Sequence, residues 1–243
     1  MLNSFLAFSQ KHHLSSSSPI LIGVSGGRDS VVLCDLYHRA DINFVIAHCN
    51  FGLREEESNE DEKFVIQLAK KYQVHLFSTN IPTKEYSEKM SISIQMSARE
   101  QRVKWFKELC KENGFEYYAT AHHSDDAVET YLINQIRGTG ISGLHGILPQ
   151  QDQLIHPLLF ASREDITNYA KTNQLNWRED SSNSKTKYLR NKIRHQVLPL
   201  LEEINNGIKK TFIENMNRIY ETEQIYHQKI EELKTELFVK TEQ

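Results

Sequence analysis

The sequence lacks the features that mark several classes of protein. Its three cysteines are an odd number without a CxxC pair, which argues against a disulfide framework, a zinc ribbon and an iron–sulfur cluster. No apolar run approaches the roughly 20 residues that span a bilayer, and the first residues contain no basic leader and no cleavage-like stretch of small residues. We therefore expect a cytoplasmic protein with no membrane partner.

An excess of positive charge is also missing. The 243 residues include 29 Lys and Arg against 32 Asp and Glu, which gives a formal charge of −3. No global field therefore draws the protein to nucleic acid, so that such a partner must be held by a local patch. The charged fraction of 25% is typical of a globular chain, and the length has room for one large domain or one domain with an appendage.

The first two thirds of the chain alternate between strand-like and helix-like periods. Short runs rich in β-branched or aromatic residues at 19–24, 43–48, 74–79 and 116–120 are separated by helical patterns at 30–40, 58–72, 97–113 and 125–136. This alternation predicts an α/β fold, a Rossmann-like parallel sheet with helices on both faces. Ligands of such sheets bind beyond the carboxyl ends of the strands, so the loops that follow the strands are the candidate site.

The end of the chain has a different pattern. From about Glu202, apolar residues recur at steps of three, four or seven, as on one face of a helix. We predict a first domain over residues 1–200 and an amphipathic helical arm over residues 201–243, with a break near Gly207. The apolar stripe from Ile204 to Leu237 must fold back, pair with a second copy in a homodimer, or meet another partner.

A glycine-rich loop between the first strand and the next helix is the sharpest local signal. Its residues are Ser25, Gly26, Gly27, Arg28, Asp29 and Ser30. The glycines let the backbone turn tightly, so that successive N–H groups and the helix N-terminus face an anion. No Walker motif is present, and Asp29 is unusual beside phosphate unless Mg²⁺ shares the site. The loop therefore predicts a nucleotide-phosphate site; the alternative is an ordinary turn capped by Asp29.

The loop resembles the SGGxDS signature of the PP-loop ATP pyrophosphatases, which split ATP between its α and β phosphates. Within that superfamily, further segments resemble the tRNA(Ile)-lysidine synthase family. They are HCNFGLR at 48–54, AREQR at 98–102, ATAHHSDDAVET at 119–130 followed by IRGTGISGL, EDSSN at 179–183 and RNKIR at 190–194. They occur in the family's order between about Ile20 and Leu200, and their combination is specific.

The resemblance implies a defined reaction. An enzyme of this family uses ATP and L-lysine to modify the wobble cytidine of the isoleucine tRNA with a CAU anticodon, and the product reads AUA instead of AUG. The cytosine carbonyl oxygen attacks the α-phosphate and releases pyrophosphate, after which the lysine ε-amine displaces AMP. The resemblance implies that Ser25 to Ser30 bind ATP, that Asp29 binds Mg²⁺, and that Arg102 is catalytic because it matches the family's functional arginine.

Carboxylates cluster after the fourth predicted strand. Asp126 and Glu129 are three positions apart, and Asp125 and Glu129 are four apart, near a helix start. Carboxylates that repel one another favour a cation. Together with His122, Asp126 and Glu129 predict a lysine site in which Asp126 accepts the proton that the ammonium loses. The alternative is helix capping by Ser124 or Asp125 with acidic residues in the first turn.

Two other motifs have weaker functional readings. His122 and His123 with the aspartates could instead bind a metal, although they match no standard zinc spacing. The segment Gly138 to Gly143 fits GxGxxG, but it follows a helix rather than a strand and so does not predict dinucleotide binding. The resemblance suggests a wall of the substrate pocket here; the alternative is a flexible loop.

A basic segment supplies the local patch that the net charge requires. It extends from Lys185 to His195 without an acidic residue. Backbone phosphates of RNA are its natural partner, which predicts RNA binding by Lys187, Arg190, Lys192 and Arg194. The alternative is that Arg190 and Arg194 pair with Glu179 and Asp180.

The chain departs from the family pattern in two places. Phe51 stands where a second histidine is more common, so the role of that imidazole is absent or taken by His48. Many members continue beyond the catalytic domain, here residues 1–200, into a C-terminal tRNA-binding region, whereas this chain stops at Gln243. Residues 201–243 are therefore expected to form a helical arm or the start of that region. Two rival functions remain open: a PP-loop tRNA cytidine sulfurtransferase, which calls for paired cysteines, and a non-catalytic nucleotide-dependent RNA-binding protein.

Overall fold

The computed structural model describes residues 1–53, 56–179 and 189–237. The chain forms two compact units, one comprising Met1–His123 with Pro149–Ser181 and the other Ser124–Leu148 with Ser182–Gln243. The predicted boundary between a catalytic domain and a helical arm at residue 200 is a different division and stays a prediction. Within the described ranges, no helix is both long and apolar enough to cross a membrane.

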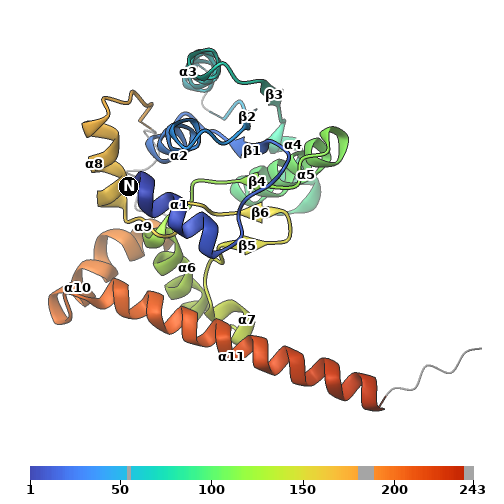
Figure 1. Cartoon of the computed structure of the whole chain (residues 1–243), viewed down its shortest axis with the longest axis vertical. Coiled ribbons are helices and arrows are strands. Elements are labelled where there is room, and N and C mark those ends of the chain that lie inside the picture. The colour runs from blue at the N-terminus through green and yellow to red at the C-terminus, as the bar shows by residue number, and fades with distance from the viewer. Residues whose placement is uncertain (54–55, 180–188, 238–243) are drawn as a thin grey trace, which may run out of the picture. The chain divides into compact units, whose positions relative to one another are not determined.

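The first unit is built on a six-stranded sheet (Figure 1). The strand order is β3-β2-β1-β4-β6-β5, and all neighbours are parallel except β5 and β6. The strands are β1 (Ile20–Gly23), β2 (Phe44–Asn50), β3 (Leu76–Asn80), β4 (Tyr118–Ala119), β5 (Gln150–Gln151) and β6 (Leu154–Ile155). The predicted Rossmann-like parallel sheet is confirmed.

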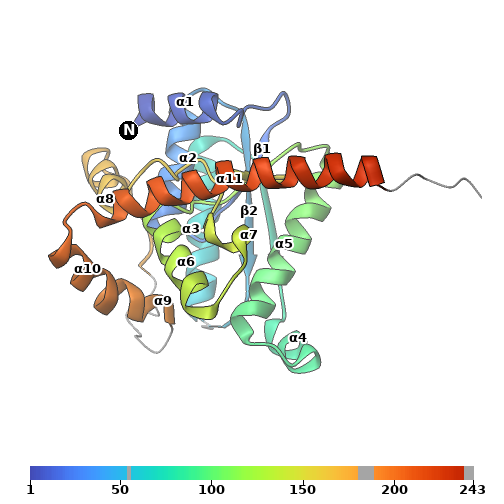
Figure 2. The same cartoon turned by 90° about the horizontal axis from the view of Figure 1, so that it is seen from below.

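Helices cover both faces of this sheet, as the alternating pattern predicted. Figure 2 shows α2 (Arg28–Arg39) and α3 (Glu56–Tyr72) on one side of β1 and β2, and α5 (Ile94–Asn113) on the other. The remaining helices of the unit are α1 (Leu2–Lys11), α4 (Thr83–Met90) and α8 (Arg163–Thr172).

The side chains of β1 alternate between two hydrophobic cores. Ile20 and Ile22 pack in the core of α2 and α3, whereas Leu21 packs with Phe106 in the core of α5. Gly23 ends the strand at a point of close approach, because a Cβ there would lie 2.7 Å from the Phe106 ring. The sequence of β1 therefore fixes how closely α5 packs beneath the loop that follows.

A buried carboxylate ties three helices together at the end of α2 remote from that loop. Asp35 is 3% exposed. It accepts hydrogen bonds from the Tyr72 hydroxyl of α3 at 3.1 Å and the Tyr169 hydroxyl of α8 at 2.8 Å, and from Arg39 Nε at 2.7 Å. A buried charge with several donors is stabilised in place, which makes Asp35 a structural cross-link.

The strand order reverses direction at β1, since β2 and β3 follow on one side and β4 and β6 on the other. In such sheets a ligand crevice forms beyond the carboxyl ends of the strands at this switch point. His123, in the loop after β4, places Nε2 3.8 Å from Oδ2 of Asp29 in the first turn of α2. The fold therefore brings the glycine-rich loop and the loop after β4 to the same place.

The second unit is helical. Its elements are α6 (Ser124–Arg137), α7 (Ile141–Leu144), α9 (Leu189–Lys192), a π-helical turn (Ile193–Val197), α10 (Leu198–Ile204) and α11 (Ile208–Leu237). The predicted C-terminal helix and its break near Gly207 are confirmed. The first half of α11 folds back within the unit, where Phe212 packs on Tyr131 with ring centroids 5.4 Å apart. Farther along, Ile225 and Tyr226 are 70% and 53% exposed.

Candidate active site

The loop between β1 and α2 has a backbone suited to an anion. Gly26 has φ +89°, a left-handed conformation that glycine adopts at little cost, and α2 begins after Gly27 without a side-chain cap. Ser25 Oγ accepts a hydrogen bond from the Gly27 N–H at 3.2 Å, and Ser30 Oγ donates to the Gly27 carbonyl at 2.8 Å. The first N–H groups of a helix have no intrahelical acceptor, so they are available to a phosphate.

The two charged residues of this loop contact each other. Arg28 donates from Nε to Asp29 Oδ1 at 2.9 Å and from Nη1 to the Thr167 hydroxyl of α8 at 2.8 Å. The Asp29 side chain is 34% exposed, and its other oxygen faces the buried His123. The guanidinium of Arg28 thus orients Asp29 and joins the start of α2 to α8.

Two carbonyl groups of the loop are held by other parts of the chain. His48, at the end of β2 and 4% exposed, donates from Nδ1 to the Val24 carbonyl at 2.8 Å. Its Nε2 is buried and has no hydrogen-bond partner among the described residues. The backbone N–H of Arg178 donates to the Gly26 carbonyl at 2.9 Å. Sequence reasoning did not identify Arg178, and the only signal for it is its place just before the EDSSN motif.

Arg102 is half-buried on α5, near Cys49 at the end of β2. Burial lowers the pKa of the Arg102 guanidinium, and burial raises the pKa of the Cys49 thiol to about 12. An arginine stays charged at neutral pH despite such a shift. Among the described residues no carboxylate forms an ion pair with Arg102. A positive charge held in this way suits contact with an anion.

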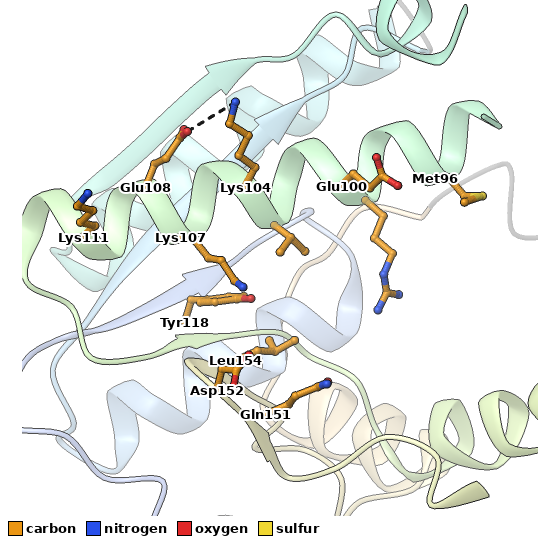
Figure 3. Close-up of a pocket in the computed structure, with 12 residues that line it drawn as sticks. Met96, Glu100, Lys104, Lys107, Glu108, Lys111, Tyr118, Gln151, Asp152 and Leu154 are labelled. Carbon is orange, nitrogen blue, oxygen red and sulfur yellow. Dashed lines mark ion pairs between the residues drawn. The ribbon is translucent and has the colours of Figure 1, made fainter. Parts of the chain in front are cut away.

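Arg99, three residues before Arg102, lies in different surroundings. It lines a groove of about 830 Å³ between α5 and the strands β4, β5 and β6 (Figure 3). Lys107 of α5 and Tyr118 of β4 point into the same part of this groove. Neither the glycine-rich loop nor Arg102 lines it. The groove is therefore distinct from the glycine-rich loop.

The predicted lysine-site carboxylates lie on α6 of the second unit. Glu129 is fully buried and accepts two hydrogen bonds from Arg194, from Nε to Oε1 at 2.7 Å and from Nη2 to Oε2 at 2.9 Å. Arg194 Nη2 also lies 3.7 Å from Asp126 Oδ1. Burial opposes the charge of Arg194, but the hydrogen bonds to Glu129 and the neighbouring carboxylates outweigh it and raise the pKa of the guanidinium.

Further cations of the chain surround this cluster. Arg190 donates to the Thr130 hydroxyl at 2.8 Å and lies 3.8 Å from Glu129. Lys209 pairs with Asp125 at 3.0 Å. Cations of the chain itself thus neutralise part of the negative charge from which an ammonium ligand was predicted. Arg194 lies in the π-helical turn, a rare local geometry that is frequent at functional sites.

The remaining predicted residues lie in different parts of the chain. His122 belongs to the first unit, where its Nδ1 lies 2.8 Å from the Thr120 hydroxyl. Lys192 is exposed in the second unit. Lys187 and Asp180 lie outside the described residues. Within the described ranges, Arg190 contacts Thr130 and Arg194 contacts Asp126 and Glu129. Binding of RNA by these two arginines stays a prediction.

Comparison with known proteins decides the family. A family described as the PP-loop domain matches residues 2–201. A tRNA(Ile)-lysidine synthase of Petrotoga mobilis is 36% identical over 88% of this chain and 70% of its own length. The chain belongs to the tRNA(Ile)-lysidine synthase family. Its resemblance to that family, stated from the motifs, is confirmed.

Other members of the tRNA(Ile)-lysidine synthase family are longer. That of Bacteroides thetaiotaomicron is 44% identical over 96% of this chain but only 55% of its own length, so the chain spans about half of that relative. Among solved structures, the U34-tRNA thiolase NcsA of Methanococcus maripaludis with its [4Fe-4S] cluster has a TM-score of 0.74 at 17% identity, over 90% of this chain and 78% of that one. At this identity the likeness is one of fold alone.

Proposed function

We propose that the protein is an ATP-dependent carbon–nitrogen ligase, a tRNA(Ile)-lysidine synthase. It joins L-lysine to the wobble cytidine of the isoleucine tRNA with a CAU anticodon. The observation that carries the proposal is the SGGRDS loop, which lies at the switch point of a parallel sheet with its helix N-terminus uncapped. The other motifs of the family accompany this loop along one chain.

In the first step ATP binds through its phosphates to the backbone of Ser25 to Ser30. The cytosine carbonyl oxygen attacks the α-phosphate, the bond to the β-phosphate oxygen breaks, and pyrophosphate leaves. The half-buried guanidinium of Arg102 stabilises the charge that develops on phosphorus oxygens. The product of this step is an adenylylated cytidine.

Asp29 suits a magnesium ion. Mg²⁺ is usually bound by one or two carboxylates together with substrate phosphates and water. The Asp29 side chain is one-third exposed beside the phosphate loop, and Arg28 occupies only its Oδ1. When bound, the ion would neutralise charge on the departing pyrophosphate. Asp29 would be its protein ligand.

In the second step the ε-amine of lysine attacks the activated ring carbon and AMP leaves with its oxygen. His122, Asp126 and Glu129 form the lysine site in this proposal, and Asp126 accepts the proton that the ammonium must lose. Glu129 contributes by holding Arg194, whose second contact is with Asp126. Asp126 is thus placed beside a fixed guanidinium.

The partner in this proposal is tRNA, held in part by Lys187, Arg190, Lys192 and Arg194. Arg190 and Arg194 would serve both the RNA and the carboxylate cluster. We expect the activity in the cytoplasm. Pairing of two copies through the exposed part of α11 stays a prediction.

The sulfurtransferase alternative is not favoured by the cysteines. Cys34 and Cys110 are buried on α2 and α5, and Cys49 is half-buried at the end of β2. Burial raises the pKa of the Cys110 thiol to about 11, so this group remains an unreactive thiol at neutral pH. Residues from three separate elements do not form the paired spacing that the rival chemistry requires.

The direct test incubates the full chain with ATP, Mg²⁺, radiolabelled L-lysine and unmodified isoleucine tRNA. We expect label in the RNA and release of AMP. The same tRNA with uridine at the wobble position is the matched control and should remain unlabelled. Absence of label in both tRNAs, with the protein folded, would contradict the proposal.

A further inference from the structure

A segment that no motif assigns clamps the glycine-rich loop. Arg178 follows α8 in the sequence and donates its backbone N–H to the Gly26 carbonyl at 2.9 Å. Its side chain donates from Nε to Oδ1 of Asp61 on α3 at 3.1 Å, across 117 positions of sequence. The loop, α3 and the segment after α8 are therefore joined through one arginine.

Gly26 is enclosed between this arginine and α3. A Cβ on Gly26 would lie 3.8 Å from Arg178 Cγ, 3.5 Å from the Phe64 ring and 3.8 Å from Val65. The Asp61 side chain is 13% exposed and that of Arg178 is 39% exposed. A largely buried carboxylate loses its hydration, so an aligned guanidinium partner stabilises it and is itself held in one orientation.

This clamp acts on the peptide group that begins the anion site. The Gly26 carbonyl and the Gly27 N–H belong to the same planar trans peptide and point in opposite directions. Holding the carbonyl therefore sets the direction of the Gly27 N–H, which donates to Ser25 Oγ at 3.2 Å, and the entry into α2. Asp61 contacts the side chain of Arg178, the residue whose backbone N–H holds this peptide.

We propose that Arg178 and Asp61 are a positioning pair that holds the Gly26 peptide in the orientation that binds ATP phosphates. This inference rests on the proposed function, because it takes ATP as the ligand of the loop. The pair stabilises the phosphate-binding form of the loop before ATP arrives, which lowers the ordering cost of binding.

The chain offers a matched control at the other end of α2. Arg39 donates from Nε to Asp35 at 2.7 Å, and the two side chains are 45% and 5% exposed. Both pairs join an arginine Nε to a largely buried aspartate in the same unit. Loss of either pair should lower stability, but only loss of the Arg178 pair should change the affinity for ATP.

The experiment measures the dissociation constant for ATP with Mg²⁺ by calorimetry, together with the thermal midpoint, on the full chain. We expect Arg178→Gln and Asp61→Asn to weaken ATP binding about tenfold, equivalent to one well-oriented charged contact. Arg178→Lys, which keeps the charge, should recover part of that loss. Arg39→Gln should lower the midpoint and leave the dissociation constant unchanged.

The outcomes separate this inference from the proposed function. If the unchanged chain has no affinity for ATP, the proposed function is wrong. If the unchanged chain binds ATP and both Arg178→Gln and Asp61→Asn bind equally well, the positioning role is wrong. The role is also wrong if Arg39→Gln weakens ATP binding as much as they do. If Arg178→Gln does not fold, the ATP affinity of Asp61→Asn tests the positioning role, because this variant keeps the Arg178 side chain and its backbone donor.

Discussion

The glycine-rich loop of the first unit and the carboxylate cluster of the second handle charge in opposite ways. In the loop, Arg28 orients the Asp29 side chain, the backbone N–H of Arg178 holds the Gly26 carbonyl, and the N-terminus of α2 has no side-chain cap. The cluster uses Arg194 and Lys209 to neutralise carboxylates directly. The first arrangement leaves backbone N–H donors for an anionic ligand. In the second arrangement, cations of the chain itself neutralise much of the negative charge that would attract a cationic ligand.

A carboxylate cluster alone does not define an amine site. Glu129 is fully buried and both its oxygens accept from Arg194, so its first role is to hold that arginine. Asp126 makes one longer contact with the same guanidinium at 3.7 Å. We therefore expect the two carboxylates, three positions apart on α6, to respond differently to the same chemical change.

The largest expected effect is on stability at Glu129. Glu129→Gln removes the charge opposite a partly buried Arg194, and an uncompensated buried charge of this kind costs about 3 kcal/mol. Urea unfolding of the full chain measures it. Glu214→Gln, which loses only an exposed contact of 3.9 Å with Arg218, is the control and should be nearly neutral. Equal midpoints for the two variants would mean that the Glu129 pair is not structural.

The next effect is on activity at Asp126. Asp126→Asn should lower lysine incorporation by about 100-fold, the usual contribution of a positioned proton acceptor, with little change in unfolding. Pyrophosphate release without lysine should persist, because that step does not use the amine. Asp125→Asn is the neighbouring control: it loses the Lys209 contact and some stability but keeps incorporation. Normal lysine incorporation by Asp126→Asn would show that Asp126 is not part of the lysine site.

A smaller effect separates the two glycines of the loop. Gly26→Ala puts a side chain at φ +89° and should destabilise the protein by about 1–2 kcal/mol while weakening ATP binding. Gly27 has φ −71°, and a Cβ there meets only the movable Ser25 hydroxyl at 3.3 Å. The free energy of unfolding of Gly27→Ala should therefore be close to that of the unchanged chain. If Gly26→Ala and Gly27→Ala have the same free energy of unfolding, the left-handed turn at Gly26 is not required.

The smallest effect concerns a second buried carboxylate of the helical unit. A hydrogen bond from Ser142 and the neighbouring His145 and His227 hold the pKa of Glu223 below its ordinary value. A lowered folded pKa means that the stabilisation is complete above the ordinary glutamate pKa of about 4.3 and is lost as pH falls through the folded value.

Unfolding of the unchanged chain and of Glu223→Gln between about pH 6 and about pH 3 tests this carboxylate. The stability gap between the two proteins should narrow as the pH falls. A gap that is constant, or that widens in acid, would show that Glu223 does not contribute through its charge.

Much of the fold was predictable because its elements have regular periods. Alternation along the chain identified β1 to β4 and most of the helices that connect them. Gly114 ends α5 at φ +69°, directly after the helical pattern predicted at 97–113. The hairpin of β5 and β6 was missed, since strands of two residues show no period and form only by pairing, β6 with β4 and β5 with β6. The helix α4 was missed as well.

The candidate site was predictable only in its local parts. The residues of the loop after β1 are contiguous, so one motif predicts them together. The contact of Arg194 with Glu129 spans 65 positions, and that of Arg178 with Asp61 spans 117. Local spacing carries no information on such pairs. Sequence reasoning therefore identified neither the contact of Arg194 with Glu129 nor the role of Arg178.

Whether the loop directs cleavage next to the α-phosphate is tested most directly by the nucleotide products. The full chain is incubated with Mg²⁺, ATP and unmodified isoleucine tRNA, with and without L-lysine, and the products are separated by chromatography. We predict pyrophosphate in both reactions and free AMP on addition of lysine. Formation of ADP and inorganic phosphate instead would contradict the assignment of the loop.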